Sequence, residues 1–151
     1  MERWRRPKGG GDATPPESGA RGLAQPEGLL KRYLAAMAST FMCNLLHIAF
    51  STKGRRPIIT PEMEAAVYPY VGGICRSMKS PLLTIGGTAD HVHLLVSLAK
   101  TVALADLMMQ VKRDSSKVIR QTIREFHWQD GYFAFSIGAS GVEDVRRYVA
   151  T

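Results

Sequence analysis

Residues 81–98 read PLLTIGGTADHVHLLVSL and contain two short apolar runs, 81–87 and 90–98. Runs of this length are typical of strands rather than of long helices. The linker GGTA at 86–89 contains glycines, which permit the backbone angles of a tight turn. The sequence therefore predicts a β-hairpin, and the neighbouring segments predict the elements around it.

Two histidines alternate with apolar residues in the second run. Side chains at i and i+2 of a strand project from the same face, so we expect His91 and His93 side by side, ~7 Å apart along the chain. Val92 and Leu94 then point into the core. Neutral imidazoles are good metal ligands. The pair is therefore a candidate metal site, although two hydrogen-bonded histidines on a half-exposed face would give the same pattern.

A strand and a helix are predicted before the hairpin. Residues 41–52, FMCNLLHIAFST, are apolar and too short for a long helix, and the basic turn KGRRP at 53–57 follows them. Residues 60–79 begin with Thr60 as a candidate N-cap and Pro61 at the first helical position. Apolar residues recur at helical spacing after this start, so we expect a buried strand and then a helix.

Three further elements are predicted after the hairpin. Residues 102–124 carry an apolar stripe at helical spacing, with Lys and Arg mainly outside it, which indicates a long amphipathic helix. Residues 132–137, YFAFSI, have the aromatic content of a strand. Ser140 and Glu143 have the spacing of a capping box, which predicts that a final helix begins there.

The predicted order is strand, helix, strand, strand, helix, strand, helix. Its first six elements are those of the ferredoxin-like, or RRM-like, split βαβ sandwich. We therefore expect an α+β fold with an antiparallel sheet, helices on one face and an additional C-terminal helix. The other face of the sheet would be free for a partner.

The composition is that of a soluble globular protein. The chain has 151 residues, of which 45% are hydrophobic and 22% charged, and two are cysteines. Two cysteines are too few for a disulfide scaffold, and no apolar run approaches the ~20 residues of a membrane span. These features argue against a disulfide-rich secreted module and a membrane protein, and favour the cytoplasm. The net charge of +7 favours a polyanionic partner.

Residues 1–36 differ from the rest of the chain. Residues 1–28 are rich in glycine and proline and contain almost no large apolar side chains, and we expect the extension 1–36 to be disordered. Met37 is a candidate second start of translation, in which case 1–36 would be a dispensable or mis-annotated extension. The expected domain is then 37–151.

A metal held by two imidazoles has positions open to phosphate oxygens, and cleavage of a phosphodiester then needs a nucleophile. The chain has five tyrosines. Tyr148 lies at the edge of the apolar stripe of the predicted final helix, from which its hydroxyl could reach the sheet. An ordinary amphipathic tyrosine would also suit this position. Tyr132 lies in an aromatic run and is expected in the core.

Four segments together resemble a known family. They are LLHIAFSTKGRRPII at 45–59, DHVHLLVSL at 90–98, WQDGYFAFSIGAS at 128–140 and VEDVRRYV at 142–149. In one register, over roughly 38–151, the chain resembles the single-tyrosine HUH transposases of the insertion-sequence-200 kind, including their REP-associated relatives.

The resemblance implies an enzyme that cleaves and rejoins single-stranded DNA and recognises DNA hairpins. It implies that His91 and His93 hold Mg²⁺ or Mn²⁺ against the scissile phosphate, and that Tyr148 attacks this phosphate to give a 5′-phosphotyrosine and a free 3′-hydroxyl. It also implies a homodimer in which the tyrosine helix of one chain serves the histidines of the other. Such an arrangement would explain why the final helix has no evident partner within its own chain.

One feature departs from the family pattern. A third metal ligand usually lies one turn beyond the tyrosine, which would be position 152, past Thr151. The two explanations are a truncated chain and a substitute ligand, Asp144, one turn before Tyr148. Both imply weak metal binding and little cleavage, because Mg²⁺ prefers oxygen ligands to imidazole.

Basic side chains in two segments are candidate phosphate contacts, although each would also suit a solvated surface. They are Lys53, Arg55 and Arg56 in the first loop and Lys112, Arg113 and Lys117 on the second predicted helix.

Two other functions remain open. A catalytically inactive relative would use the same fold to bind single-stranded nucleic acid, although the aromatic motif of RRM domains is missing. A metallohydrolase would use water as the nucleophile, and the only further imidazoles are His47 and His127. Replacing Tyr148 by Phe separates the three functions, because only a tyrosine transferase would then lose covalent capture of DNA.

Overall fold

The computed structural model describes residues 42–150. The elements are β1 (Leu45–Ser51), the 3-10 turn η1 (Lys53–Arg55), α2 (Pro61–Ser77), β2 (Leu82–Thr88), β3 (His91–Ser97), α3 (Leu104–Ile119), β4 (Phe133–Ile137), the 3-10 turn η2 (Ala139–Gly141) and α4 (Val142–Ala150). This succession confirms the predicted order of strands and helices. The expectations about residues 1–36 and Met37 lie outside the described residues.

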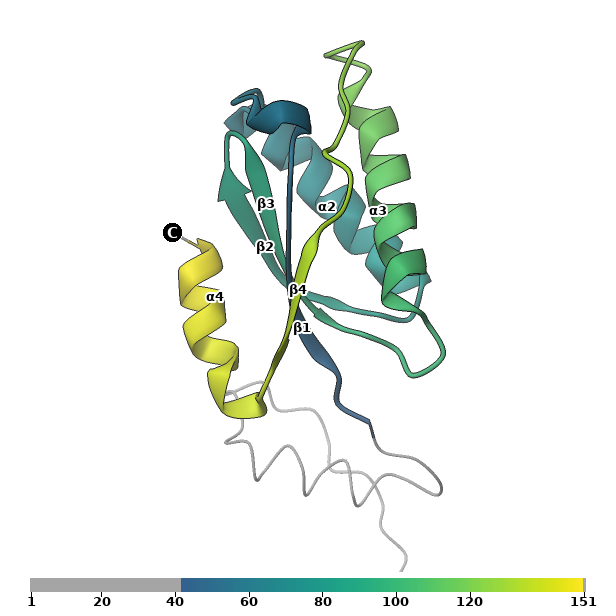
Figure 1. The fold of residues 1–151 in the computed structure, drawn as a ribbon, viewed down its shortest axis with the longest axis vertical. Coiled ribbons are helices and arrows are strands. Elements are labelled where there is room, and N and C mark those ends of the chain that lie inside the picture. The colour runs from purple at the N-terminus through teal and green to yellow at the C-terminus, as the bar shows by residue number, and fades with distance from the viewer. Residues whose placement is uncertain (1–41, 151) are drawn as a thin grey trace, which may run out of the picture. The chain divides into compact units, whose positions relative to one another are not determined.

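The four strands form one antiparallel sheet in the order β2-β3-β1-β4. The central strands β3 and β1 therefore lie between the hairpin strand β2 and the late strand β4. Helices α2 and α3 cover one face of the sheet, and α4 lies on the opposite face (Figure 1). The predicted α+β fold with a split βαβ topology is confirmed.

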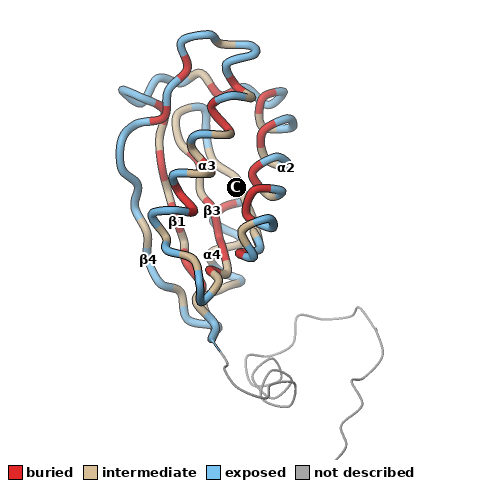
Figure 2. Tube along the Cα trace, turned by 90° about the vertical axis from the view of Figure 1, so that its right-hand side faces the viewer, coloured by how far each residue is buried: buried red, intermediate tan, exposed pale blue. Residues whose placement is uncertain are grey.

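The core lies between the sheet and the pair α2 and α3. Ile48 and Phe50 of β1 and Val92 and Leu94 of β3 are all buried in it, as the alternation in the sequence predicts. Buried positions run along the inner sides of both helices (Figure 2). The residues between these apolar positions, including the histidines, therefore face the side of the sheet that carries α4.

Helix α2 begins as predicted, and α3 ends earlier than predicted. Thr60 caps α2 by accepting a hydrogen bond from the N–H of Met63, at 3.4 Å. Helix α3 ends at Ile119, five residues before the expected 124, and the chain then turns. This turn brings Phe126 and Trp128 into the core, where both are buried, so tertiary packing ends the helix.

The glycines of the hairpin do not form its turn, contrary to the prediction. Gly86 and Gly87 lie inside β2, and the turn is formed by Ala89 and Asp90. A Cβ atom at Gly86 would lie 2.1 Å from the carbonyl oxygen of Val149 in α4. Glycine at position 86 is therefore required for the close approach of a helix rather than for a turn.

Helix α4 has a partner in its own chain, and the expectation that it has none is wrong. It packs against β2 and β3, and Val149 is 3% exposed. The helix begins at Val142, because Ser140 lies in the preceding 3-10 turn η2 instead of acting as its cap. The second face of the sheet is therefore covered by α4 on its β2 side.

The rest of this second face is open along β4, which is exposed along most of its length (Figure 2). Phe133 is 71% and Phe135 62% exposed, and Tyr132, expected in the core, is also exposed. The expectation for Tyr132 is wrong because this residue precedes β4 and lies at the outer edge of the α3 side, where its ring is 6.0 Å from the ammonium group of Lys112. Within residues 42–150, no helix is both long and apolar enough to cross a membrane.

Candidate active site

The two histidines of β3 stand side by side, as predicted. The ring centroids of His91 and His93 are 4.9 Å apart, and both side chains are partly buried. They lie on the face of the sheet that carries α4. The spacing in the sequence therefore produces a real pair of adjacent imidazoles.

His91 is oriented by the residues at the hairpin turn. Its Nδ1 lies 2.6 Å from Oδ1 of Asp90 and 2.8 Å from the hydroxyl of Thr88. A carboxylate accepts hydrogen bonds, so Nδ1 carries the proton and donates it to Asp90. In the neutral ring the second nitrogen, Nε2, then carries the lone pair that a metal would bind, and it makes no hydrogen bond to the described residues.

Asp90 is held as a carboxylate. Hydrogen bonds from His91, Thr88 and Arg55 hold its pKa well below the usual range. The Nε atom of Arg55 donates to Oδ2 of Asp90 at 2.9 Å. Gly54 and Arg55 have φ of 66° and 52°, so two successive left-handed residues reverse the chain and return Arg55 toward the hairpin turn. Arg55 is therefore part of the site, and it still exposes 68% of its side chain.

His93 has an imidazole partner of its own. Nε2 of His47, on β1, lies 3.0 Å from Nδ1 of His93. Burial lowers the pKa of His47; burial, followed by repulsion from the neighbouring imidazoles, lowers that of His93. Both rings are therefore neutral at pH 7. When Nδ1 of His93 carries the shared proton, its Nε2 carries a lone pair, as in His91.

The role of His47 was missed from the sequence. His47 alternates with the apolar residues Ile48 and Phe50 along β1, so the sequence does predict that it lies on the face of the sheet away from the core. Its proximity to His93 depends on the pairing of β1 with β3, which the sequence pattern does not specify.

Tyr148 lies beside the histidines of the same chain. Its ring centroid is 5.4 Å from that of His93 and 6.0 Å from that of His47, in both cases edge-on. The side chain is 61% exposed. A single chain thus brings the predicted nucleophile to the predicted ligands, whereas the resemblance implied the helix of a second chain.

The histidine pair fits a divalent metal ion. The two imidazoles have their Nδ1 atoms engaged by Asp90 and His47, and hydrogen bonds to this second ring nitrogen orient metal-binding histidines in proteins. Among the described residues, no three His, Cys, Asp or Glu side chains are grouped so as to hold a metal ion. Asp144 is 80% exposed and pairs with Arg147 at 3.6 Å, so it does not complete a group with the histidines here.

The six basic residues predicted to contact DNA lie in different places. Lys53, Arg55 and Arg56 are exposed next to the hairpin turn. Arg113 and Lys117 pair with Asp114 at 3.1 and 2.9 Å on α3, on the face of the sheet away from the histidines.

The side chain of Lys112 makes contacts within the chain. It donates to the backbone carbonyls of Gln129, at 2.7 Å, and of Gly131. Its ammonium group also lies 5.6 Å from the centroid of the Phe50 ring. Partial burial lowers the pKa of Lys112. Lys112 therefore supports the loop before β4, and its predicted contact with DNA stays a prediction.

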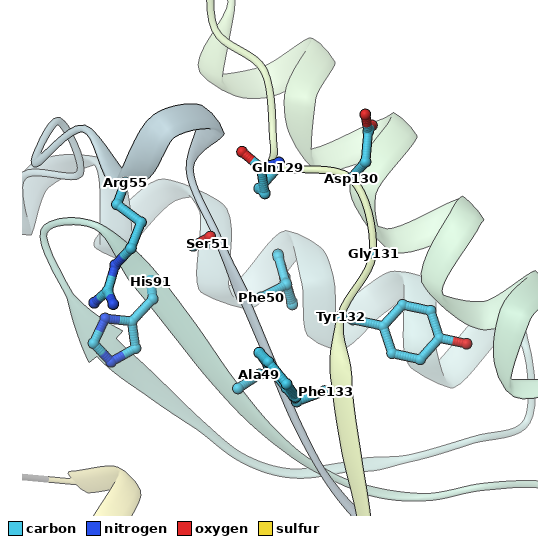
Figure 3. Close-up of a pocket in the computed structure, with 10 residues that line it drawn as sticks. All are labelled: Ala49, Phe50, Ser51, Arg55, His91, Gln129, Asp130, Gly131, Tyr132 and Phe133. Atoms are coloured by element: carbon cyan, nitrogen blue, oxygen red, sulfur yellow. The ribbon is translucent and has the colours of Figure 1, made fainter.

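A pocket of about 500 Å³ opens next to His91. Arg55 and His91 lie on one side of it, and Gln129 and Phe133 come from the segment that leads into β4 (Figure 3). The full lining is Ala49, Phe50, Ser51, Arg55, His91, Gln129, Asp130, Gly131, Tyr132 and Phe133.

Comparison with known sequences gives one consistent result. The family model described as "Transposase IS200 like" matches residues 40–151. The transposases for insertion sequence element IS200 of Salmonella typhimurium strain LT2 and of Salmonella typhi are each 27% identical to this chain over 101 residues. The match covers 61% of this chain and 66% of each relative, just under two thirds of their length.

Solved structures show the same fold. A transposase candidate from Deinococcus radiodurans R1 superposes with a TM-score of 0.61 at 15% identity, covering 76% of this chain and 95% of that one. A REP-associated tyrosine transposase bound to a REP hairpin superposes with a TM-score of 0.54 at 11% identity, covering 75% of this chain and 67% of that one. The resemblance inferred from the sequence is confirmed.

Proposed function

Because the chain belongs to the family of IS200-like transposases, we propose that it cleaves and rejoins single-stranded DNA during transposition. Tyr148 is the nucleophile, and His91 and His93 are the metal ligands. The observation that carries this proposal is the distance of 5.4 Å between the ring centroids of Tyr148 and His93. Nucleophilic catalysis requires the nucleophile and the groups that stabilise the developing charge to meet at one place.

The proposed reaction is an attack by the tyrosine hydroxyl on a backbone phosphate. A bond forms between the phenolic oxygen of Tyr148 and phosphorus, and the bond between phosphorus and the 3′-oxygen breaks. The phenolic proton is lost and the leaving 3′-oxygen gains a proton, which gives a 5′-phosphotyrosine and a free 3′-hydroxyl. The phosphotyrosine is still a phosphodiester, so a 3′-hydroxyl can reverse the step without ATP.

Two residues outside the motif keep the ligands in place. Asp90 fixes the tautomer and ring orientation of His91, and His47 orients the ring of His93 through the hydrogen bond between their nitrogens. A bound Mg²⁺ or Mn²⁺ would supply positive charge to the scissile phosphate. Both ions favour oxygen ligands, which the phosphate itself provides.

The proposed substrate is single-stranded DNA that contains a hairpin. Support comes from the family, from the net charge of +7, and from the exposed Lys53, Arg55 and Arg56 beside the site. The REP hairpin is the ligand of the similar structure, and its use here is part of the proposal.

The test is covalent capture of DNA. The purified chain is mixed with Mn²⁺ and a labelled single-stranded hairpin DNA from the sequence flanking its gene, and denaturing gels are searched for a protein–DNA adduct. We expect the adduct with the native chain and its loss in Tyr148→Phe and on chelation of the metal. Tyr70→Phe is the matched control, because Tyr70 is 43% exposed on α2, on the other face of the sheet.

Two outcomes would replace the proposal with another function. Continued DNA cleavage by Tyr148→Phe would indicate a metallohydrolase that uses water. Binding of the DNA without an adduct, by the native chain and both variants, would indicate a relative that binds single-stranded nucleic acid without cleaving it.

A further inference from the structure

The pocket beside His91 adjoins the histidine pair without being needed to hold a metal. We propose that it binds one unpaired base of the single-stranded DNA, from the nucleotide next to the phosphate that the histidines face. This inference rests on the proposed function and adds a base-binding subsite to it.

The strand register leaves room for a flat ring. Ala49 of β1 pairs with His93 on one side and with Phe133 on the other. On this face of the sheet a methyl group therefore lies between two rings that are two strand spacings, or roughly 10 Å, apart. Ser51, also small, pairs with His91. The floor of the pocket is thus made of small side chains between larger ones.

The walls have the chemistry that a base requires. Phe133 is 71% exposed and offers an apolar ring on which a base can stack. The side-chain oxygen of Gln129 accepts a hydrogen bond from the N–H of Gly54 at 3.1 Å. Its amide nitrogen makes no hydrogen bond to the described residues and is left to donate to a base edge.

The position of the pocket links the base to the reacting phosphate. His91 lines the pocket and is also one of the two proposed metal ligands. Arg55 stands beside it with 68% of its side chain exposed, so it offers a positive charge to the adjoining phosphate. A nucleotide with its phosphate at His91 therefore has its base over Ala49 and against Phe133.

The charge around the pocket favours DNA over a second copy of the chain. Arg55 lines the pocket, and Lys53 and Arg56, close to Arg55 in the sequence, are exposed. Asp130 is the one carboxylate in the lining, and its side chain points away from Arg55 and His91 (Figure 3). A basic rim around an aromatic wall is the combination that binds single-stranded nucleic acid.

The test compares two exposed phenylalanines of the same strand. Phe133→Ala removes the pocket wall, whereas Phe135→Ala removes a ring that is 62% exposed on the same face but does not line the pocket. Both changes are made in a Tyr148→Phe chain, and binding of the hairpin DNA is measured by fluorescence anisotropy. We expect Phe133→Ala to weaken binding about five- to a hundredfold, the range for loss of one stacked base, and Phe135→Ala to weaken it less than about twofold.

A second readout locates the base. Each unpaired thymine of the DNA is replaced in turn by 5-iodouracil, which cross-links to aromatic rings that it contacts under near-ultraviolet light. We expect one position to cross-link to the peptide that contains Phe133, and this cross-link to vanish in Phe133→Ala.

The outcomes separate the pocket from the proposed function. Equal binding by the Phe133 and Phe135 variants, with cross-links elsewhere, would overturn the pocket while leaving strand cleavage in place. A change in sedimentation of Phe133→Ala with unchanged DNA binding would assign this surface to a second copy and also overturn it. Failure of the parent chain to bind the DNA would remove the proposed function and the pocket together.

Discussion

At the scale of single residues, the chemistry of the histidine pair depends on side chains behind it. His91 and His93 are presented by β3, but their ring orientations are set by Asp90 and His47. Only one of these two partners adjoins the motif in sequence. The donor atoms available to a metal are therefore decided by a hairpin turn and by a neighbouring strand.

Asp90→Ala should lower the affinity for Mn²⁺ about 10- to 100-fold, because His91 loses the acceptor that fixes its tautomer. Isothermal titration calorimetry of the whole chain measures this. Asp114→Ala is the control: hydrogen bonds from Lys117 and Arg113 lower the pKa of Asp114 to about 2, but it lies on α3, away from the histidines. Equal affinities in the two variants would contradict the role given to Asp90.

Cys75 tests the core independently of DNA. Burial raises the pKa of its thiol to about 11, and the side chain is fully buried in α2. We expect iodoacetamide to label only Cys43, which is exposed, between neutral pH and about pH 9, and to label both thiols in denaturant. Mass spectrometry measures the labelling of each thiol. Labelling of Cys75 in the native chain as fast as that of Cys43 would contradict the described packing of α2.

At the scale of elements, the position of Tyr148 depends on how closely α4 approaches β2. The approach is possible because residue 86 has no side chain: a Cβ there would lie 2.1 Å from the backbone oxygen of Val149. Since Tyr148 precedes Val149, any displacement of the helix at this contact also displaces the tyrosine.

Gly86→Ala should therefore reduce adduct formation at least tenfold and destabilise the fold by about 1–3 kcal/mol through overpacking. Gly73→Ala is the matched control, because a Cβ at that position of α2 meets nothing within 4 Å and alanine favours a helix by about 0.5–1 kcal/mol. Thermal unfolding and the covalent capture assay give the two readouts. Normal capture by a folded Gly86→Ala chain would contradict the proposed positioning of Tyr148 by this contact.

Patterns in the sequence predicted the elements and the hairpin between β2 and β3, but not the contacts between side chains of segments that are distant in the sequence. The alternation around Val92 and Leu94 was enough to place both histidines on one face. Three features depend on contacts between segments that are distant in the sequence. They are the close approach of α4 to Gly86, the contact of His47 with His93 and the exposure of Phe133. The same limit explains the early end of α3, where burial of Phe126 overrides an apolar stripe that continues to Thr122.

At the scale of the whole molecule, a single chain contains both the proposed metal ligands, His91 and His93, and the proposed nucleophile, Tyr148. Helix α4 brings Tyr148 to His93 from the side of the sheet opposite α2 and α3 (Figure 1). The uncovered half of the same face carries the pocket and the exposed rings of β4. The chemistry and the proposed DNA contacts therefore share one face of the sheet.

A mixture of two inactive variants tests whether the site is built within one chain. We expect His93→Ala and Tyr148→Phe each to form no adduct, and their mixture to form none either, because each chain supplies its own tyrosine. Recovery of the adduct in the mixture would instead show that the tyrosine helix of one chain serves the histidines of another, in a homodimer.

The most direct test of the proposed active site is to identify the residue that becomes attached to DNA. The chain is incubated with Mn²⁺ and hairpin DNA, the adduct is digested with nuclease and protease, and the peptides are analysed by mass spectrometry. We expect a nucleotide phosphate on Tyr148 and on none of the other tyrosines, Tyr33, Tyr68, Tyr70 and Tyr132. A nucleotide attached to any of those four, or DNA cleaved with no modified tyrosine, would contradict the claim that Tyr148 and the histidine pair form the active site.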